Sequence, residues 1–294
     1  MDTIVFIFFV IIKRIIPLFP LRFSQLCAKI CALFFYSIIP IRKKVAAANL
    51  KLCFPGISGK EINKIVKEAY INVITVIVEF LYFPKLDRDK IISLVNVTNA
   101  ELIPAKLKEG KGLIIVSAHF GNWELTAYGV SRIINEPLYV IVKEQTNKRI
   151  DKSINHIREL HGNRMIDMKQ SPREILKLLN ENKIVAMLGD QSAPQESSAK
   201  VNFFIPDVPM FEGAARIAIK TGAAILFGVS FRNDDGTYSL TLKDFDMSKY
   251  KEYNEENVKA LTQEHASLLE KAIRERPGHW LWFHRKFKSI LDYI

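Results

Sequence analysis

The sequence has few cysteines and few turn-forming residues, and each shortage narrows its class. Its three cysteines, at positions 27, 31 and 53 of 294 residues, fit no disulfide framework, and we expect them to be small buried side chains in a reducing compartment. Glycine and proline number only 13 and 12, and no Ser/Gly-rich or Pro-rich tract resembles a linker. Internal repeats and low-complexity segments are absent too. The simplest partition is an N-terminal region, residues 1–58, followed by one catalytic domain, residues 59–294.

Acidic residues are missing between Thr3 and Lys60, and this stretch carries most of the net charge of +11. Outside it, 33 basic residues nearly balance the 31 acidic ones. The nine basic residues of the stretch are Lys13, Arg14, Arg22, Lys29, Arg42, Lys43, Lys44, Lys51 and Lys60. They alternate with the apolar runs "TIVFIFFVII" and "ICALFFYSIIPI". Near an anionic membrane surface each such cation contributes on the order of 1 kcal/mol. A nucleic acid would require the charge on a polar face, so we expect a membrane surface as a partner and no nucleic acid.

Long unbroken apolar runs are also missing. A helix that spans a bilayer needs about 20 mostly apolar residues, but Lys13 and Arg14 interrupt the first run and Pro40 ends the second. We therefore expect membrane-associated helices that lie on the surface. A single tilted span with snorkelling cations and an ordinary buried helical hairpin are the alternatives. A cleaved signal peptide is disfavoured because the positive charge follows the apolar run.

The remaining sequence predicts an α/β fold. A long helix is expected over residues 59–83, and then short apolar runs alternate with helical periods. The expected strands are residues 112–118, 137–142, 164–167, 183–190, 223–231 and 238–245, and the expected helices are residues 123–134, 147–162, 171–182, 211–222 and 255–276. This alternation favours a mostly parallel central sheet. In such sheets the chemistry lies beyond the carboxyl ends of the strands, near which we place His119, Arg164 and Asp190.

The segment "IIVSAHFGNWEL" contains a histidine and a glutamate five residues apart. On one continuous helix this spacing would rotate Glu124 roughly 140° away from His119. The two side chains meet only if the chain turns between them, and Gly121 provides the backbone freedom for that turn. Asn122 is a good N-cap for the helix that follows. We expect Glu124 to bind the far ring nitrogen of His119 and stabilise the imidazolium that forms when the histidine accepts a proton.

"HFGNWE" resembles the His-x4-Glu signature of the lysophospholipid-acyltransferase superfamily, in the form found in the lipid A late acyltransferases. Further blocks resemble that family in the same order: "HGNRMID", "AMLGDQ", "VNFF", "GAARIAIKTGAAILFGVSF" and "RPGHWLWFHRKFK". The sequence departs from the family at Gly189-Asp190, where Pro-Asp is common, and at "FFIP", where Phe-Phe-Gly is usual. These departures concern the acceptor and the chain length more than the reaction.

The resemblance implies a glycerol-3-phosphate-acyltransferase-like domain that transfers a fatty acyl chain from acyl-carrier protein to a hydroxyl of a lipid A precursor. His119 would be the general base, assisted by Glu124. The expected substrate-binding residues are Arg164, Asp190, Gln191 and Asn122. No cofactor and no metal are expected, and the enzyme would act on the cytoplasmic face of the inner membrane.

The sequence leaves several alternatives to this function open. The acceptor could be another glycolipid or a phospholipid, the donor could be acyl-CoA, and the chain could be a non-catalytic lipid-binding protein of the same fold. An intact His119–Glu124 pair counts against that last possibility. A thioesterase or lipase would require a G-x-S-x-G elbow, which the sequence lacks. The pairs His156/His161 and His279/His284 are not accompanied by an HExxH motif or a cysteine pair, as a zinc site would require.

Overall fold

The computed structural model describes residues 2–169 and 171–293, and it confirms the α/β class. Its central sheet has the strand order β11-β8-β2-β5-β3-β4. Strands β8, β2, β5, β3 and β4 are parallel and β11 pairs antiparallel with β8, as the predicted mostly parallel sheet requires. The strands are β2 (Leu113–Ser117), β3 (Leu138–Val142), β4 (Arg164–Asp167), β5 (Ile184–Leu188), β8 (Ala224–Phe227) and β11 (Lys243–Asp244).

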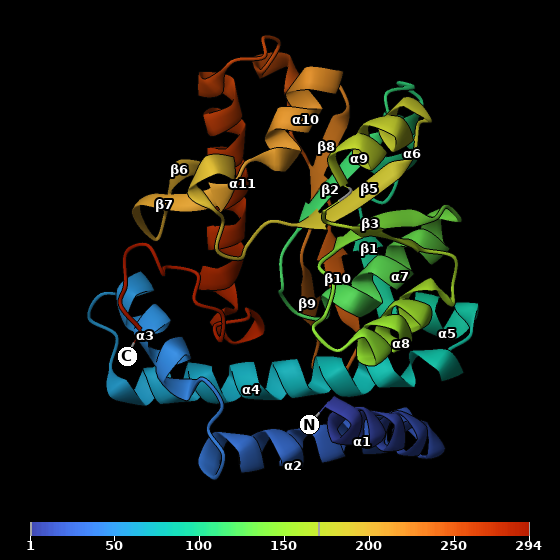
Figure 1. Ribbon diagram of the computed structural model, residues 1–294, viewed down its shortest axis with the longest axis vertical. Coiled ribbons are helices and arrows are strands. Elements are labelled where there is room, and N and C mark those ends of the chain that lie inside the picture. The colour runs from blue at the N-terminus through green and yellow to red at the C-terminus, as the bar shows by residue number, and fades with distance from the viewer. Residues whose placement is uncertain (1, 170, 294) are drawn as a thin grey trace.

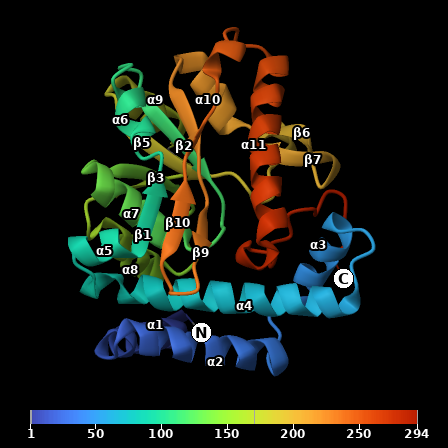
Figure 2. The ribbon, with the colours of Figure 1, turned by 180° about the vertical axis from the view of Figure 1, so that it is seen from behind.

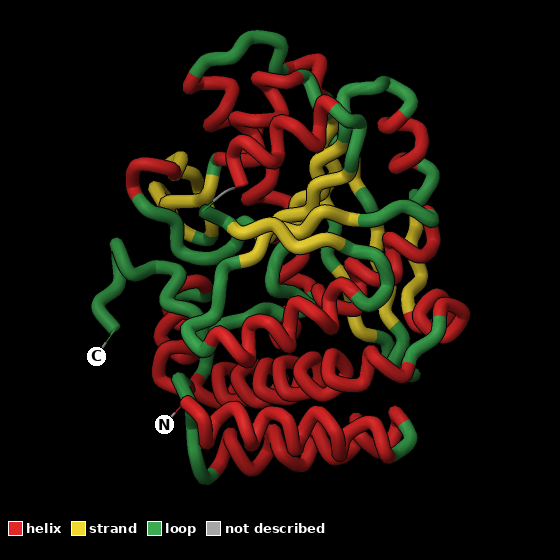
Figure 3. Tube along the Cα trace, turned by 45° about the vertical axis from the view of Figure 1, so that its right-hand side comes forward, coloured by secondary structure: helices red, strands yellow, loops and turns green. Residues whose placement is uncertain are grey.

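Helices cover both faces of this sheet, and Figure 3 shows the strands in the middle of the molecule with helices on either side. Alternate residues of β2 enter different hydrophobic clusters, Ile114 and Val116 on one face and Leu113 and Ile115 on the other. A strand buried on both faces needs a continuous apolar run, which "LIIV" supplies. The covering helices are α6 (Leu102–Leu107), α7 (Trp123–Ile134), α8 (Lys148–Glu159), α9 (Ser171–Asn180), α10 (Gly213–Thr221) and α11 (Glu255–Glu275).

Two expected strands are each divided between two sheets. The run 223–231 forms β8 and then β9 (Ser230–Arg232), and the run 238–245 forms β10 (Tyr238–Thr241) and then β11. Strands β9 and β10 join β1 (Val95–Thr98) in a three-stranded sheet. Each run reads as one strand because apolar residues stand on both sides of the break, so the sequence predicted single strands. It also assigned no strands to β1 or to the hairpin of β6 (Ser198–Phe203) and β7 (Ile205–Phe211).

The long helix predicted from residue 59 is α4 (Gly59–Tyr82), which begins with a capping box between Ser58 and Glu61. Helices α1 (Asp2–Ile15) and α2 (Leu21–Ser37) lie beneath α4, at the opposite end of the molecule from α6, α9 and α10 (Figures 1 and 2). The apolar residues that α2 buries are small, namely Ala28 and Ala32. Helices α3 (Lys43–Cys53) and α5 (Arg88–Leu94) flank the two ends of α4.

The N-terminal helices expose apolar side chains. Helix α1 buries none of its residues, and within the described residues no helix is both long and apolar enough to cross a membrane. The most exposed large apolar side chains of residues 2–41 are 55–72% exposed, namely Ile4, Phe8, Leu18, Leu26, Ile30, Ile38 and Ile41. Cys27 and Cys31 are exposed as well, which corrects the expectation that they are buried; only Cys53 is.

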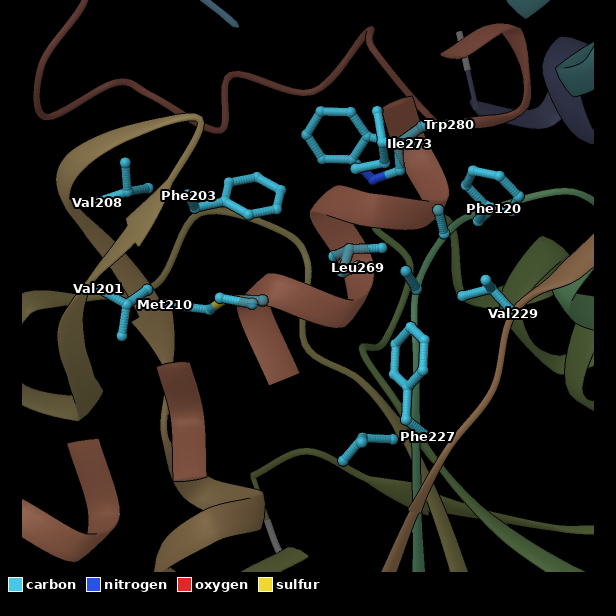
Figure 4. Packing of buried hydrophobic residues seen from close by; sticks show 14 of the residues in the cluster. Phe120, Val201, Phe203, Val208, Met210, Phe227, Val229, Leu269, Ile273 and Trp280 are labelled. Atoms are coloured by element: carbon cyan, nitrogen blue, oxygen red, sulfur yellow. The ribbon is translucent and has the colours of Figure 1, made fainter. Parts of the chain in front are cut away.

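The C-terminal aromatic segment packs on the core and consists mainly of turns. Trp280, Trp282 and Phe287 are at most 2% exposed. Trp280 forms an isolated antiparallel bridge with Phe120, the residue after His119. Figure 4 shows Trp280 beside Ile273 of α11, in the same cluster of buried side chains as Phe120 and Leu269. The C-terminal segment therefore supports the back of the predicted catalytic corner.

Candidate active site

The chain turns between β2 and α7 as the sequence predicted. Gly121 has a φ of 57°, and a Cβ at this position would lie 1.9 Å from the Ser230 carbonyl oxygen. Only glycine fits so close an approach in a left-handed conformation. Asn122 caps α7, because its side chain accepts a hydrogen bond from the Leu125 amide at 2.9 Å. The turn brings His119 to the carboxyl end of the sheet, where parallel α/β sheets bind their ligands.

The carboxylate that binds His119 is Asp190, which follows the adjacent strand β5. The Asp190 Oδ1 lies 2.8 Å from Nδ1 of His119, and its Oδ2 accepts hydrogen bonds from the His119 amide at 3.1 Å and the Trp280 indole at 2.9 Å. Burial of Asp190, which is 3% exposed, raises its pKa. The charge and hydrogen bonds of His119 and the bond from Trp280 outweigh this effect and lower the pKa to about 2. Asp190 is thus an ionised acceptor that holds a proton on Nδ1 of His119.

The other ring nitrogen of His119 faces the cavity. Its Nε2 lies 3.3 Å from the side-chain nitrogen of Gln191. With Nδ1 donating to Asp190, a neutral imidazole has its lone pair on Nε2. That nitrogen is the one available to accept a proton from a substrate. The structure therefore brings His119, Asp190 and Gln191 together, as the sequence predicted, but with Asp190 in the orienting position expected for Glu124.

Glu124 binds an arginine, which corrects the expectation that it binds His119. Its carboxylate accepts two hydrogen bonds from Arg158 of α8, one of them from Nε at 3.0 Å. The Glu124 and Arg158 side chains are 15% and 21% exposed, and both line the same cavity as His119. Burial lowers the pKa of Arg158, but the Glu124 charge more than offsets it and raises the pKa. Glu124 therefore lies near His119 in the first turn of α7, as predicted, but its side chain binds α8 and not the histidine.

The arginine predicted from "HGNRMID" is not at this site. Arg164 is the first residue of β4, pairs in register with Tyr139, and is exposed. The amino end of a parallel strand lies at the edge of the sheet opposite to the carboxyl ends, so Arg164 does not line the cavity. Arg158, six residues earlier, occupies the place expected for it. Arg158 lies in the last turn of α8, and the sequence alone does not show that this turn lies beside Glu124.

Asn122 was expected to bind substrate, and its burial corrects this. It is 0% exposed, and its amide nitrogen donates to Glu79 of α4 at 2.7 Å. Glu79 also accepts hydrogen bonds from Gln25 at 2.7 Å, Tyr238 at 2.6 Å and Arg232 at 3.3 Å. A buried carboxylate with four donors is well satisfied. This network joins α2, α4, α7, β9 and β10 directly behind the catalytic corner, so Asn122 positions the corner from inside.

A buried lysine, which sequence reasoning did not single out, supports the loop after Asp190. Lys286 is 2% exposed, and its ammonium donates to the Gln191 carbonyl at 3.1 Å and the Pro209 carbonyl at 3.0 Å. Burial lowers its pKa to about 8, although the Asp190 charge acts in the opposite direction. The only sequence signal was its place in the cation-rich ending "HRKFK", where a buried lysine looks like its exposed neighbours.

These residues surround a cavity of about 820 Å³. One part of its wall is polar and contains His119, Glu124, Arg158 and Gln191. The other part is apolar and reaches between the sheet and α7, lined by Ile115, Val130, Leu138, Ala186, Leu240 and Leu242. A base at the junction of a polar mouth and an apolar interior suits a substrate that has a reactive polar group and a long apolar chain.

Comparison with known proteins yields a consistent set of relatives. A sequence model of the family described as bacterial lipid A biosynthesis acyltransferase matches residues 2–289. The Escherichia coli lipid A biosynthesis lauroyltransferase is 26% identical over 253 residues, covering 84% of this chain and 79% of that protein. The Escherichia coli palmitoleoyltransferase is 24% identical over 250 residues, with the same coverage. The phosphatidylinositol mannoside acyltransferase of Mycolicibacterium smegmatis is 24% identical over 207 residues, covering 69% of this chain and 65% of that protein.

Proposed function

Because the chain belongs to the bacterial lipid A biosynthesis acyltransferase family and is an acyltransferase, we propose that it transfers a fatty acyl chain from acyl-carrier protein to a hydroxyl of a lipid A precursor. The observation that carries this proposal is the position of His119. Its Nε2, which carries the lone pair, faces a cavity whose inner wall is apolar, and its Nδ1 is bound to ionised Asp190. A general base in front of an acyl-sized cavity is what the reaction requires.

In the proposed reaction, Nε2 of His119 removes the proton of the acceptor hydroxyl. The hydroxyl oxygen attacks the thioester carbonyl carbon, the new C–O bond forms and the C–S bond breaks. The imidazolium then returns its proton to the departing thiolate. Asp190 stabilises the imidazolium while it carries the extra charge. The acceptor hydroxyl would take the place of the Gln191 amide, which lies 3.3 Å from Nε2.

Glu124 and Arg158 have a separate proposed role. Two hydrogen bonds from Arg158 to Glu124 fix the guanidinium in the cavity wall. A planar guanidinium held in this way binds a carbonyl or phosphate oxygen with defined geometry. We therefore transfer to Arg158 the substrate-binding role expected for Arg164, with Glu124 as its positioning partner.

We further propose that residues 1–58 attach the enzyme to the cytoplasmic face of the inner membrane, with residues 59–294 as the acyltransferase domain. The support is the coincidence of two properties in α1 and α2. These helices expose many large apolar side chains, and their sequence contains basic residues with no acidic residue after Asp2. Apolar insertion and attraction to anionic lipids then act on the same surface.

A second acceptor class has support of its own. The chain is similar to a phosphatidylinositol mannoside acyltransferase as well as to lipid A acyltransferases. A different glycolipid or a phospholipid acceptor would leave the chemistry at His119 unchanged.

The experiment is acyl transfer by the full-length protein in neutral detergent. Acyl-carrier-protein thioester and acyl-CoA serve as alternative donors, and the lipid fraction of a strain lacking the gene serves as acceptor. Mass spectrometry should show one lipid species that gains a single acyl chain, faster with the carrier-protein donor. The identity of that lipid decides between the acceptors, and equal rates would contradict the proposed donor. If no lipid gains a chain with either donor, the proposed function is wrong.

A further inference from the structure

The cavity that contains His119 has an excess of unpaired positive charge at its mouth. Four exposed cations line it, namely Arg42, Lys143, Arg285 and Lys288. Within the described part of the chain, none of the four forms an ion pair. The carboxylate among the lining residues is Glu124, and Arg158 neutralises it. The mouth thus attracts an anion of more than one charge.

Three of these cations come from two chain segments that are fixed to each other. Arg42 precedes α3, and its guanidinium donates to the Phe283 carbonyl at 3.2 Å. Asn49 of α3 is 0% exposed, and its amide donates to the Trp282 and His284 carbonyls at 2.8 and 2.9 Å. These bonds hold the segment that carries Arg285 and Lys288 against α3. The cations therefore sit on a rigid surface.

The neighbours of these cations indicate the kind of anion. Ile38, Ile39 and Ile41, directly before Arg42, are 66%, 49% and 58% exposed, and Ile290, after Lys288, is 45% exposed. Cations beside exposed isoleucines suit the level of a bilayer where phosphates meet acyl chains. The surface of an acidic protein would leave the isoleucines without an apolar partner. A lipid head group satisfies both features.

We propose that Arg42, Arg285 and Lys288, together with Lys143 at the end of β3, bind a phosphate group of the acceptor lipid. The anchored phosphate would hold the lipid so that its hydroxyl reaches Nε2 of His119. This inference rests on the proposed acyl transfer and adds a binding site to it. Removing the cations should weaken acceptor binding and leave the chemical step at His119 unchanged.

The test uses the full-length protein in neutral detergent, with acyl-carrier-protein thioester as donor and the lipid fraction of the deletion strain as acceptor. The double variant Arg285→Gln/Lys288→Gln should raise the acceptor KM at least tenfold, with kcat within about twofold of the original. The charge-preserving pair Arg285→Lys/Lys288→Arg should keep the KM within about threefold. The matched control, Lys259→Gln/Lys271→Gln, removes two exposed cations of α11 and should change neither parameter.

Dihexanoyl phosphatidic acid serves as the probe of the anion site. It should compete with the acceptor, whereas uncharged dihexanoylglycerol and inorganic phosphate at the same concentration should not, and the double variant should lose the competition. Equal inhibition by inorganic phosphate would mean a site for a free anion and would overturn the assignment to a lipid head group. A rise in the donor KM in place of the acceptor KM would mean that the mouth docks the carrier protein, and would also overturn it. An unchanged acceptor KM with normal transfer would refute this inference alone, whereas absence of transfer by the original protein would refute the proposed function.

Discussion

The corner around His119 buries polar side chains, whereas the helices of residues 2–37 expose apolar ones. Behind the corner, Glu79, Asn122 and Asp190 are at most 3% exposed, and each has hydrogen-bond partners on two or more elements. In α1 no side chain is buried, and residues such as Ile4 and Phe8 are both 64% exposed. Polar groups are inside in one region and apolar groups are outside in the other.

The difference shows that the two regions are adapted to different surroundings. A buried charge costs free energy unless it is paired, so the pairing of Asp190 marks a site that holds charge away from water. Exposed apolar patches of this extent mark surfaces that contact a membrane or another protein. Glu79 connects the two regions, because it accepts hydrogen bonds from Gln25 of α2 and from Asn122 at the corner.

The largest effect is expected from removing the base. His119→Ala should lower the rate of acyl transfer by about 10²–10⁴-fold, which is typical for the loss of a positioned general base. Thermal unfolding and vesicle binding should stay close to those of the original protein, since His119 lies at the cavity wall and not in α1 or α2, which expose their apolar side chains. Acyl transfer at the original rate would show that the corner is structural only.

A somewhat smaller effect is expected from Asp190→Asn. An amide carries no charge to stabilise the imidazolium, and its NH2 group can donate to Nδ1 and favour the wrong tautomer of His119, so kcat should fall about 10²-fold or more. Asp89→Asn, at an exposed carboxylate of α5, is the matched control and should have no effect. If Asp190→Asn also lowers the free energy of unfolding, the fold of the corner depends on this buried charge, unlike the exposed helices α1 and α2.

On the membrane side, replacing Arg22, Lys29 and Lys44 by glutamine should weaken binding to phosphatidylglycerol vesicles about 10- to 100-fold in total. All three side chains are exposed. The loss should shrink at high salt because exposed charges are screened, while the binding due to apolar side chains persists. Vesicle sedimentation at low and high salt measures the charge-dependent binding and the apolar binding separately. Unchanged binding at low salt would mean that these helices contact something other than an anionic membrane.

The smallest effect concerns a buried histidine of α11. Burial lowers the pKa of His265 from 6.5 to about 4. The unfolded chain therefore binds a proton near pH 6 that the folded chain does not, and stability is lost as the pH falls from about 6.5 toward 4. His265→Leu should remove about 2 kcal/mol of the decrease in unfolding free energy between pH 6.5 and 4.5. Burial also lowers the pKa of His279 to about 4, so the variant should retain the part of the pH dependence that is due to His279. Urea unfolding measures the free energy at each pH, and a pH dependence equal to that of the original protein would contradict the role given to His265.

Local patterns predicted the fold well because hydrophobic period and capping are local. The helix from residue 123 to 134 and the strand from 164 to 167 were predicted with the bounds that the structure has. The two divided strands were predicted wrongly because the changes of sheet at Gly228 and Leu242 leave apolar residues on both sides of the break. Which sheet a strand joins depends on its pairing with strands distant in the sequence, and this pairing cannot be read from one sequence.

The sequence predicted which residues lie at the site better than it predicted which of them bind one another. His119, Glu124 and Gln191 all line the cavity, with Asp190 directly behind His119. Which carboxylate binds which cation depends on how β2, β5 and α8 lie beside one another, so the exchange of Glu124 for Asp190 and of Arg164 for Arg158 could not be foreseen. Asn122 was predicted correctly as a helix cap, but its burial depends on Glu79, more than 40 residues away.

The central claim, that His119 catalyses acyl transfer to a lipid, is tested most directly by mass spectrometry of total lipids from a deletion strain. The strain would carry either the original gene or the His119→Ala gene at equal protein levels. We predict that the original gene restores one lipid species heavier by a single acyl chain, and that the His119→Ala gene does not. Equal restoration by both genes, or no lipid change on deletion, would contradict the account.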